Sequence, residues 1–238
     1  MIYLRSALFA LIQVAATIVF AILAWFTFPF GAHTRYRVIT LWNRLVVWLA
    51  QHLCGIRYEI RGREHMPRAP AVVLAKHQSA WETIALPVLL PPLALVAKKE
   101  LLRVPFFGWG LAMLSPIAID RGAGREALKQ ILRQGAARLQ EGFGVLVFPE
   151  GTRMRPGESG RYGIGGAWLA AHTGTAVVPV AHNAGELWGR DAFVKYPGTI
   201  TVSIGPPIAT RGLKPDAVNE AARAWIEAEM ERLPRARA

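Results

Sequence analysis

The hydrophobic pattern divides the chain into an apolar N-terminal region and a longer body in which short apolar runs alternate with mixed segments. Residues 6–32 contain no Asp, Glu, Lys or Arg. As a helix rising about 1.5 Å per residue, this run is roughly 40 Å long, more than a hydrocarbon core of about 30 Å. Pro29 is expected to end or kink it. The pattern therefore predicts a membrane-embedded helix at the N-terminus.

The flanks of this run indicate an orientation. Positive charge is heavier after the run than before it, with Arg5 before and Arg35, Arg37 and Arg44 after. Aromatic residues gather near its far end, as at a membrane interface: Trp25, Phe26, Phe28 and Phe30. The charge bias predicts that the rest of the chain is cytoplasmic. A cleaved signal peptide fits poorly, because the run is too long and too aromatic. A helical hairpin that dips into one leaflet stays open.

A second apolar stretch, residues 38–56, carries polar side chains at Asn43, Arg44, Gln51 and His52. This mixture predicts an amphipathic helix that lies on the membrane or on the domain, not a second span. Residues 1–60 are thus expected to form membrane-embedded and amphipathic helices, and residues 61–238 a separate domain.

In the body of the chain, after a charged patch at residues 61–68, apolar runs of strand length alternate with helical segments. Strands are expected at residues 71–75, 93–97, 116–119, 145–148 and 176–180, with a sixth near an edge at 199–204. Helices are expected at 81–90, 124–140, 164–173 and 215–233. This alternation predicts an α/β fold: a largely parallel mixed sheet flanked by helices and preceded by the N-terminal membrane helices.

Composition narrows the class of partner. The chain has 28 Lys+Arg against 16 Asp+Glu, 53% hydrophobic residues and a mean hydropathy of +0.26. A positive excess suits nucleic acid, or anionic lipid and phosphorylated substrates. The sequence has no zinc-finger spacing, basic-plus-heptad pattern or aromatic RNA-binding signature. Membrane lipid is therefore the expected partner, and nucleic acid is not. The single cysteine, Cys54, excludes an internal disulfide and gives no metal-binding pattern.

Polar side chains follow the ends of five predicted strands. In open α/β sheets, ligands bind outside the carboxyl ends of the strands. A histidine, carboxylates and several cations are therefore expected at one edge, which indicates an anionic substrate beside a general base. These residues are Lys76 and His77, Lys98 and Lys99, Asp120 and Arg121, Glu150 and Arg153, and His182.

The stretch KHQSAWET contains His77 and, five residues later, Glu82. On one continuous helix the two would lie about 140° apart and would not meet. With His77 in a loop and Glu82 in the first helical turn, the carboxylate would orient an imidazole that takes a proton from an alcohol. The stretch from Ser79 to Glu82 also has the form of a capping box, in which Glu82 bonds back to the Ser79 amide. The local pattern favours the cap and leaves both roles open.

Two further motifs favour phosphate. Phe148–Arg153 joins a predicted strand to a charged turn, and Arg153 suits a bidentate grip on a phosphate group. Arg121 precedes a Gly-containing loop at a helix start, where N–H groups can face an anion. Motifs of serine hydrolases, zinc proteases, P-loop enzymes and dinucleotide-binding enzymes are absent from the sequence. No obvious nucleophile lies beside His77 apart from Ser79, which is a weak candidate. Direct transfer is therefore expected instead of a covalent acyl-enzyme.

Taken in order, these blocks resemble the 1-acylglycerol-3-phosphate acyltransferases of bacterial phospholipid synthesis, the PlsC-like family. Four family blocks have counterparts, the third without change: His77–Glu82, Ile117–Arg121, Phe148–Arg153 and Val177–Val180. The resemblance spans about residues 74–181, and the N-terminal membrane segment also fits. One position departs from the pattern, because the acid of the first block is usually Asp and here is Glu82. That side chain is one methylene longer.

The resemblance implies that His77, with Glu82, deprotonates the 2-hydroxyl of a lysophosphatidic acid. The hydroxyl then attacks the thioester of an acyl donor, and phosphatidic acid is formed. It also implies roles in substrate binding. The glycerol phosphate would be held by Arg121, Glu150, Gly151, Thr152 and Arg153, with Lys98 and Lys99 adding positive charge and Pro179 near the acyl site.

The resemblance also implies the setting of the reaction. The donor would be acyl carrier protein or coenzyme A carrying a thioester, and no metal or bound cofactor is needed. The enzyme would lie in the bacterial inner membrane with its catalytic domain on the cytoplasmic side. Two other interpretations stay open: an acyltransferase for another lyso-lipid, such as a lyso-ornithine lipid or another lysophospholipid, and a non-catalytic lipid-binding membrane protein.

Overall fold

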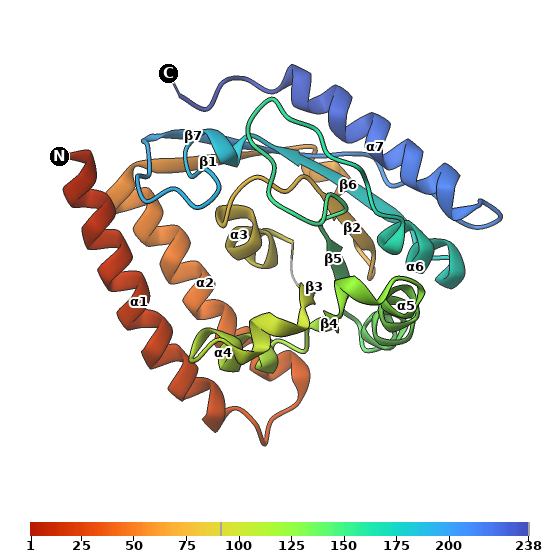
Figure 1. Cartoon of the computed structure of the whole chain (residues 1–238), viewed down its shortest axis with the longest axis horizontal. Helices are drawn as coiled ribbons and strands as arrows, with labels where there is room; N and C mark the ends of the chain where they lie inside the picture. The colour runs from red at the N-terminus through yellow and green to blue at the C-terminus, as the bar shows by residue number, and fades with distance from the viewer. Residues whose placement is uncertain (91, 238) are drawn as a thin grey trace.

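A computed structural model describes residues 1–90 and 92–237, except for the side chain of Arg121. Its centre is a seven-stranded sheet with helices on both faces (Figure 1). The strand order is β1-β7-β6-β2-β5-β3-β4, and neighbouring strands are parallel except β6 and β7. The strands are β1 (Ile56–Arg61), β2 (Val72–Ala75), β3 (Leu93–Lys98), β4 (Ile117–Ile119), β5 (Gly144–Val147), β6 (Val177–His182) and β7 (Gly198–Ile204). The predicted fold class is confirmed.

The helices connect these strands and also form the N-terminal region. They are α1 (Ile2–Phe26), α2 (Ala32–Cys54), α3 (Trp81–Leu89), α4 (Phe107–Met113), α5 (Arg125–Gln140), α6 (Gly165–Thr173) and α7 (Pro215–Arg232). The predicted helices in the body agree with α3, α5, α6 and α7 to within a few residues. The sequence pattern did not predict α4 or the strand β1.

The region around Gly55 corrects two predictions. A helix was expected over residues 38–56, but Gly55 adopts a left-handed φ of 71° that caps α2, and β1 begins at the next residue. β1 pairs along its length with β7. β7 therefore lies between β6 and the edge strand β1, so the strand expected at residues 199–204 is near an edge, as predicted, without being the edge itself. The expected boundary after residue 60 falls inside β1.

Alternate residues of the central strands face two apolar layers, as the pleat requires. Val73 and Ala75 of β2 face the layer that includes side chains of α1, α2 and α3, whereas Val72 and Leu74 face the layer with α5, α6 and α7. All four side chains are fully buried. Because successive side chains of an extended strand alternate between its faces, the two residues that follow β2 lie on opposite sides of the sheet.

The N-terminal helices α1 and α2 form a hairpin packed on the body of the domain (Figure 1). Among the described helices, α1 alone is long and apolar enough to cross a membrane by length and composition. It ends at Phe26, and Pro29 lies in the turn that follows, which confirms the expected end. Its inner face is tied to the domain, since the Phe9 ring packs edge-on against Trp188 and the Ser6 hydroxyl accepts a hydrogen bond from the Lys195 amide.

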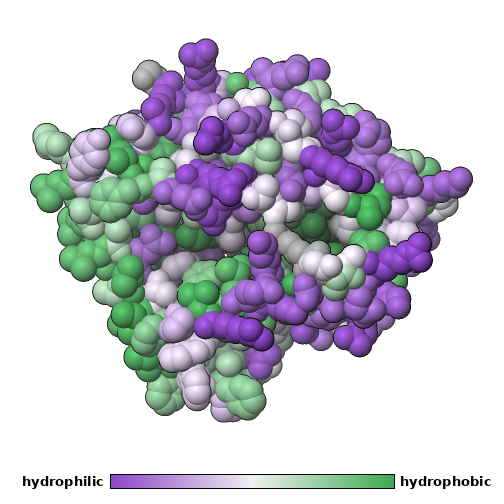
Figure 2. Space-filling model, viewed as in Figure 1, coloured by the Kyte–Doolittle hydropathy of each residue, from purple (hydrophilic) through white to green (hydrophobic). Residues whose placement is uncertain are grey.

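The outer face of α1 exposes a row of large apolar side chains. Figure 2 shows hydrophobic residues gathered on the side of the molecule where α1 lies, with hydrophilic residues over most of the rest of that view. The exposed residues include Leu4, Leu8, Leu11, Val14, Val19, Ile22, Trp25 and Phe26. A continuous apolar face of this kind marks a membrane or protein contact.

Candidate active site

His77 lies in the loop that follows β2, and Glu82 lies in the first turn of α3. His77 Nδ1 is 2.8 Å from Glu82 Oε1, and the imidazole stacks on the Phe148 ring at a centroid distance of 4.2 Å. Since an ionised carboxylate can only accept, Nδ1 carries the proton. Nε2 is then the basic nitrogen, and no hydrogen bond engages it among the described residues. The side chain is 13% exposed, enough for a substrate to reach it.

Glu82 makes the contacts that both of its predicted roles require. The same oxygen, Oε1, also accepts hydrogen bonds from the amides of Ser79, at 2.8 Å, and Gln78, at 2.9 Å. Ser79 Oγ accepts from the Trp81 amide, so it contributes to the helix start but not in the reciprocal bond of a standard capping box. Burial alone would raise the pKa of Glu82, but the hydrogen bonds from His77 and the Ser79 amide help to hold that pKa below its usual value. Glu82 is therefore ionised.

A second histidine, His182 at the end of β6, supports the loop that carries His77. Its Nε2 donates a hydrogen bond to the Lys76 carbonyl at 2.7 Å, and its Nδ1 accepts one from the Ala184 amide. The ring is fully buried, and burial lowers its pKa despite the Glu82 carboxylate 4.0 Å away. The imidazole is therefore neutral, as expected for a core histidine and not a metal ligand.

The structure places Glu150 inside the protein, which contradicts its expected role in holding glycerol phosphate. One carboxylate oxygen lies 2.8 Å from the buried Lys76 ammonium, and the other accepts a hydrogen bond from the His77 amide at 2.9 Å. The side chain is 0% exposed. A carboxylate would also repel a phosphate group. Glu150 instead fixes the backbone at His77.

The neighbouring turn residues stand at the protein surface. Gly151 has a φ of 69°, a conformation that favours glycine, and Thr152 is exposed. Arg153 is 33% exposed and lies 3.6 Å from the Asp191 carboxylate. These residues stand near the loop of His77, since the Met154 amide donates to the His77 carbonyl at 2.7 Å.

Other cations lie at the ends of β3 and β4. Lys98 ends β3 with an exposed side chain, and Lys99 forms an ion pair with Asp120. The Lys99 bond, together with the Gly122 amide, lowers the pKa of Asp120. The Arg121 side chain lies outside the described residues, although its backbone forms the first residue of a 3-10 turn, Arg121–Ala123.

Pro179 lies on the opposite face of the sheet from His77. Its ring packs close to Gly205 and Trp225 of α7, and it pairs in register with Leu74, which faces the same layer. The expectation that Pro179 lies near the acyl site does not fit this placement. A proline within an apolar strand does not reveal which face it occupies until the register is known.

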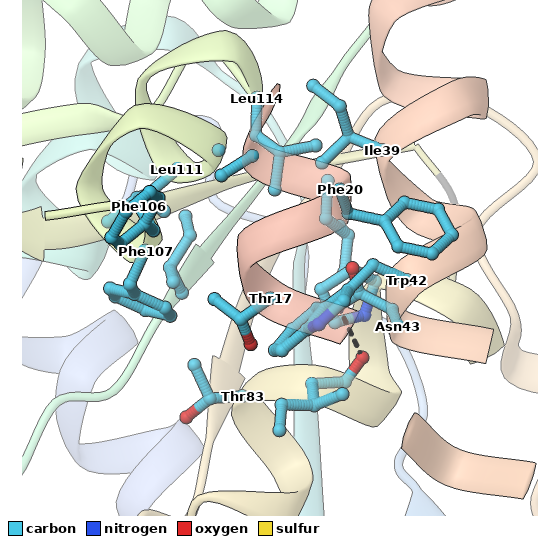
Figure 3. Close-up of a pocket in the computed structure, with 16 residues that line it drawn as sticks. Thr17, Phe20, Ile39, Trp42, Asn43, Thr83, Phe106, Phe107, Leu111 and Leu114 are labelled. Carbon is cyan, nitrogen blue, oxygen red and sulfur yellow. Dashed lines mark hydrogen bonds between the residues drawn. The ribbon is translucent and has the colours of Figure 1, made fainter. Parts of the chain in front are cut away.

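An apolar cavity that the sequence did not reveal lies on the His77 face of the sheet. It lies between α1, α2, α3, α4 and β3 and is partly open to solvent. Figure 3 shows side chains from these separate elements turned toward it. Thr83 and Ile84 of α3 line the cavity directly after Glu82. Other lining residues include Phe20, Ile39, Trp42, Leu95, Phe107, Leu111 and Leu114. Glu82, the carboxylate of the His77–Glu82 dyad, therefore lies on the same helix as part of the cavity lining.

The chain is similar in sequence and in fold to known acyltransferases. A model of the Acyltransferase family matches residues 57–183. A 1-acyl-sn-glycerol-3-phosphate acyltransferase of Pseudomonas aeruginosa is 46% identical over 233 residues, which cover 95% of this chain and 90% of the relative. The 1-acyl-sn-glycerol-3-phosphate acyltransferase alpha of Mus musculus is 31% identical over 179 residues, covering 74% of this chain and 63% of the relative.

The fold has a solved counterpart as well. The crystal structure of the 1-acyl-sn-glycerophosphate acyltransferase PlsC from Thermotoga maritima matches with a TM-score of 0.78, covering 96% of this chain and 94% of that chain. The two sequences are 20% identical, so this likeness concerns the fold. The family match includes the residues around both His77 and Glu150, and a relative 46% identical covers nearly the full chain. The chain belongs to the acyltransferase family.

Proposed function

We propose that this protein transfers an acyl chain from an acyl thioester to the 2-hydroxyl of 1-acyl-glycerol-3-phosphate, giving phosphatidic acid. The observation that carries this proposal is the contact between His77 Nδ1 and the buried Glu82 carboxylate, at the start of the helix, α3, that also lines an apolar cavity. The activity for which the Pseudomonas relative is named supports the same acceptor.

The dyad supports direct transfer. His77 Nε2 accepts the proton of the 2-hydroxyl as its oxygen attacks the thioester carbonyl carbon. The new carbon–oxygen bond forms, the carbon–sulfur bond breaks, and the imidazolium returns the proton to the leaving thiolate. Glu82 stabilises the imidazolium between these steps. Ser79 is fully buried, and its hydroxyl oxygen already accepts the Trp81 amide, which argues against a covalent intermediate on it.

The acceptor phosphate would lie among the cations at the carboxyl ends of the strands. Arg153 offers a partly exposed guanidinium suited to bidentate phosphate binding. Lys98, the last residue of β3, adds an exposed ammonium. Arg121 retains the phosphate-binding role that the family blocks imply. An acyl chain fits the cavity next to α3, because its lining is almost entirely apolar.

The reaction as written requires an acyl carrier protein or coenzyme A thioester as co-substrate and needs no metal or bound cofactor. The protein associates with membranes, as the exposed apolar face of α1 and the activity named for its relatives indicate. Its proposed place is the bacterial inner membrane with the catalytic side cytoplasmic, on the charge bias of Arg35, Arg37 and Arg44 after the apolar run.

A comparison of acceptors tests this proposal. The purified protein in lipid vesicles would receive one acyl thioester and, in parallel, lysophosphatidic acid, lysophosphatidylcholine or a lyso-ornithine lipid, with products measured by mass spectrometry. Phosphatidic acid is expected as the main product. Preference for an acceptor without a phosphate monoester would contradict the substrate, and absence of transfer to every acceptor would favour a lipid-binding role.

A further inference from the structure

Lys76, the residue before His77, is buried on the opposite face of the sheet. Its side chain is 1% exposed, and its ammonium lies 2.8 Å from Glu150 Oε1 and 3.0 Å from Glu227 Oε1 of α7. It also donates to the Glu158 carbonyl at 3.1 Å. The ammonium therefore makes two hydrogen bonds, to Glu158 and Glu227, and forms ion pairs with both Glu150 and Glu227. Burying a charge is costly unless it is paired and hydrogen-bonded, and this site supplies both conditions.

Glu227 is the outer member of this network. It accepts a hydrogen bond from the Tyr162 hydroxyl at 2.8 Å on the same oxygen that faces Lys76. Burial raises the pKa of Glu227, but the bonds from Lys76 and Tyr162 outweigh it and hold that pKa below its usual value. Glu227 is therefore a carboxylate that anchors the Lys76 ammonium from α7.

The inner member of the network, Glu150, reaches the catalytic loop. Its second oxygen accepts the His77 amide at 2.9 Å, while the His77 carbonyl accepts the Met154 amide and the Lys76 carbonyl accepts His182 Nε2. The peptide groups on both sides of His77 are thus anchored. Of these bonds, the one that Glu150 accepts from the His77 amide depends on a buried negative charge, which Lys76 balances.

We propose that Lys76 and Glu227 are positioning residues for His77. The Glu227–Lys76 pair holds Glu150 in the orientation that receives the His77 amide, so that α7 takes part in placing the imidazole. Without the ammonium, the buried Glu150 carboxylate would have to take up a proton or turn toward water, and either change would weaken its bond to the His77 amide. This inference rests on the proposed function, because it assigns the residues to the same transfer reaction.

A matched pair on α7 provides the test. Glu227→Gln keeps an oxygen that accepts from Lys76 and Tyr162 but removes the charge. Glu229→Gln is the control, since Glu229 is also partly buried on α7 and accepts a hydroxyl, that of Ser203, outside the network. We expect Glu227→Gln to lower kcat about 10-fold with the KM of both substrates unchanged, because small misplacements of a general base are costly. Glu229→Gln should retain the wild-type kcat.

A double-mutant cycle tests the order of action. If Lys76 acts through Glu150, Lys76→Met costs no further kcat in a Glu150→Gln background; a loss equal to the product of the two single losses would overturn the proposal. If Lys76→Met does not fold, the α7 pair alone decides. Equal kcat in Glu227→Gln and Glu229→Gln, with only melting temperatures lowered, would also overturn it. An inactive wild type would instead refute the proposed function.

Discussion

Lys76 and His77 are neighbours in the chain but serve opposite faces of the sheet, and the two faces are built on different principles. On the Lys76 face, a buried ammonium is paired with Glu150 and with Glu227 of α7. On the His77 face, one imidazole nitrogen is fixed by Glu82, and the helix that carries Glu82, α3, also lines an apolar cavity. In the proposed mechanism, ion pairs on the far side of the sheet thus help to place the reactive imidazole.

Removing the carboxylate that fixes His77 should produce the largest effect of the substitutions that sharpen this contrast. Glu82→Ala removes the acceptor of both the imidazole and the two loop amides, so we expect kcat to fall about 10³-fold. Stability should fall as well, by about 1–3 kcal/mol, because buried donors lose their partner. Glu82→Gln keeps an accepting oxygen, so its kcat should fall while its stability changes little. Steady-state kinetics and thermal melts measure both quantities; unchanged kcat in Glu82→Gln would exclude a charge effect on the imidazolium.

Arg153 tests whether the open edge of the His77 face recognises phosphate. Arg153→Ala should lower kcat/KM for lysophosphatidic acid about 10- to 100-fold, the range of one lost charge-assisted hydrogen bond. An acceptor without phosphate provides the control, because its kcat/KM should not respond. Equal losses for both acceptors would show that Arg153 holds the turn and not the substrate.

Filling the cavity tests whether the apolar chain lies on the His77 face. Leu111→Trp places a bulkier, aromatic side chain in the cavity and should shift the preferred acyl chain to shorter lengths. The ratio of kcat/KM for long donors to that for short donors should fall about 10-fold. Pro179→Ala changes a residue on the opposite face and should leave this preference as in the wild type. The assay is competition between acyl thioesters of different length. A shift caused by Pro179→Ala and not by Leu111→Trp would show that the acyl chain binds on the face of the sheet opposite His77.

The sequence predicted the fold class and the proposed reaction better than it predicted the spatial arrangement of the site residues. The order of the motifs led to His77, Glu82 and Arg153, and the alternation of apolar runs led to the sheet. The role of Glu150 was missed because its partners, the His77 amide and Lys76, become neighbours only when β2 and β5 pair. The cavity was missed for a similar reason, since four helices far apart in sequence line it. The period-two alternation of β2 does hold one usable signal, because it sends Lys76 and His77 to opposite faces.

The smallest expected effect concerns the pH dependence of stability at His182. Burial lowers its pKa in the folded state, so the unfolded chain binds a proton first as the pH falls through about 6.5. Stability should therefore decline as the pH is lowered below that value and should be retained above it. His182→Gln should show a flatter decline between pH 7.5 and pH 5.5, by about 1 kcal/mol, in denaturant unfolding. An identical slope in both proteins would show that His182 does not titrate on unfolding.

His77 is the proposed general base of an acyl transfer to lysophosphatidic acid. The most direct test of this role is the rate at which purified His77→Ala forms phosphatidic acid in vesicles, with melting temperature and vesicle binding measured on the same sample. We predict a loss of about 10³-fold or more, with the fold and membrane association retained, because the reaction then has no base at the hydroxyl. Wild-type turnover by folded, membrane-bound His77→Ala would contradict the account.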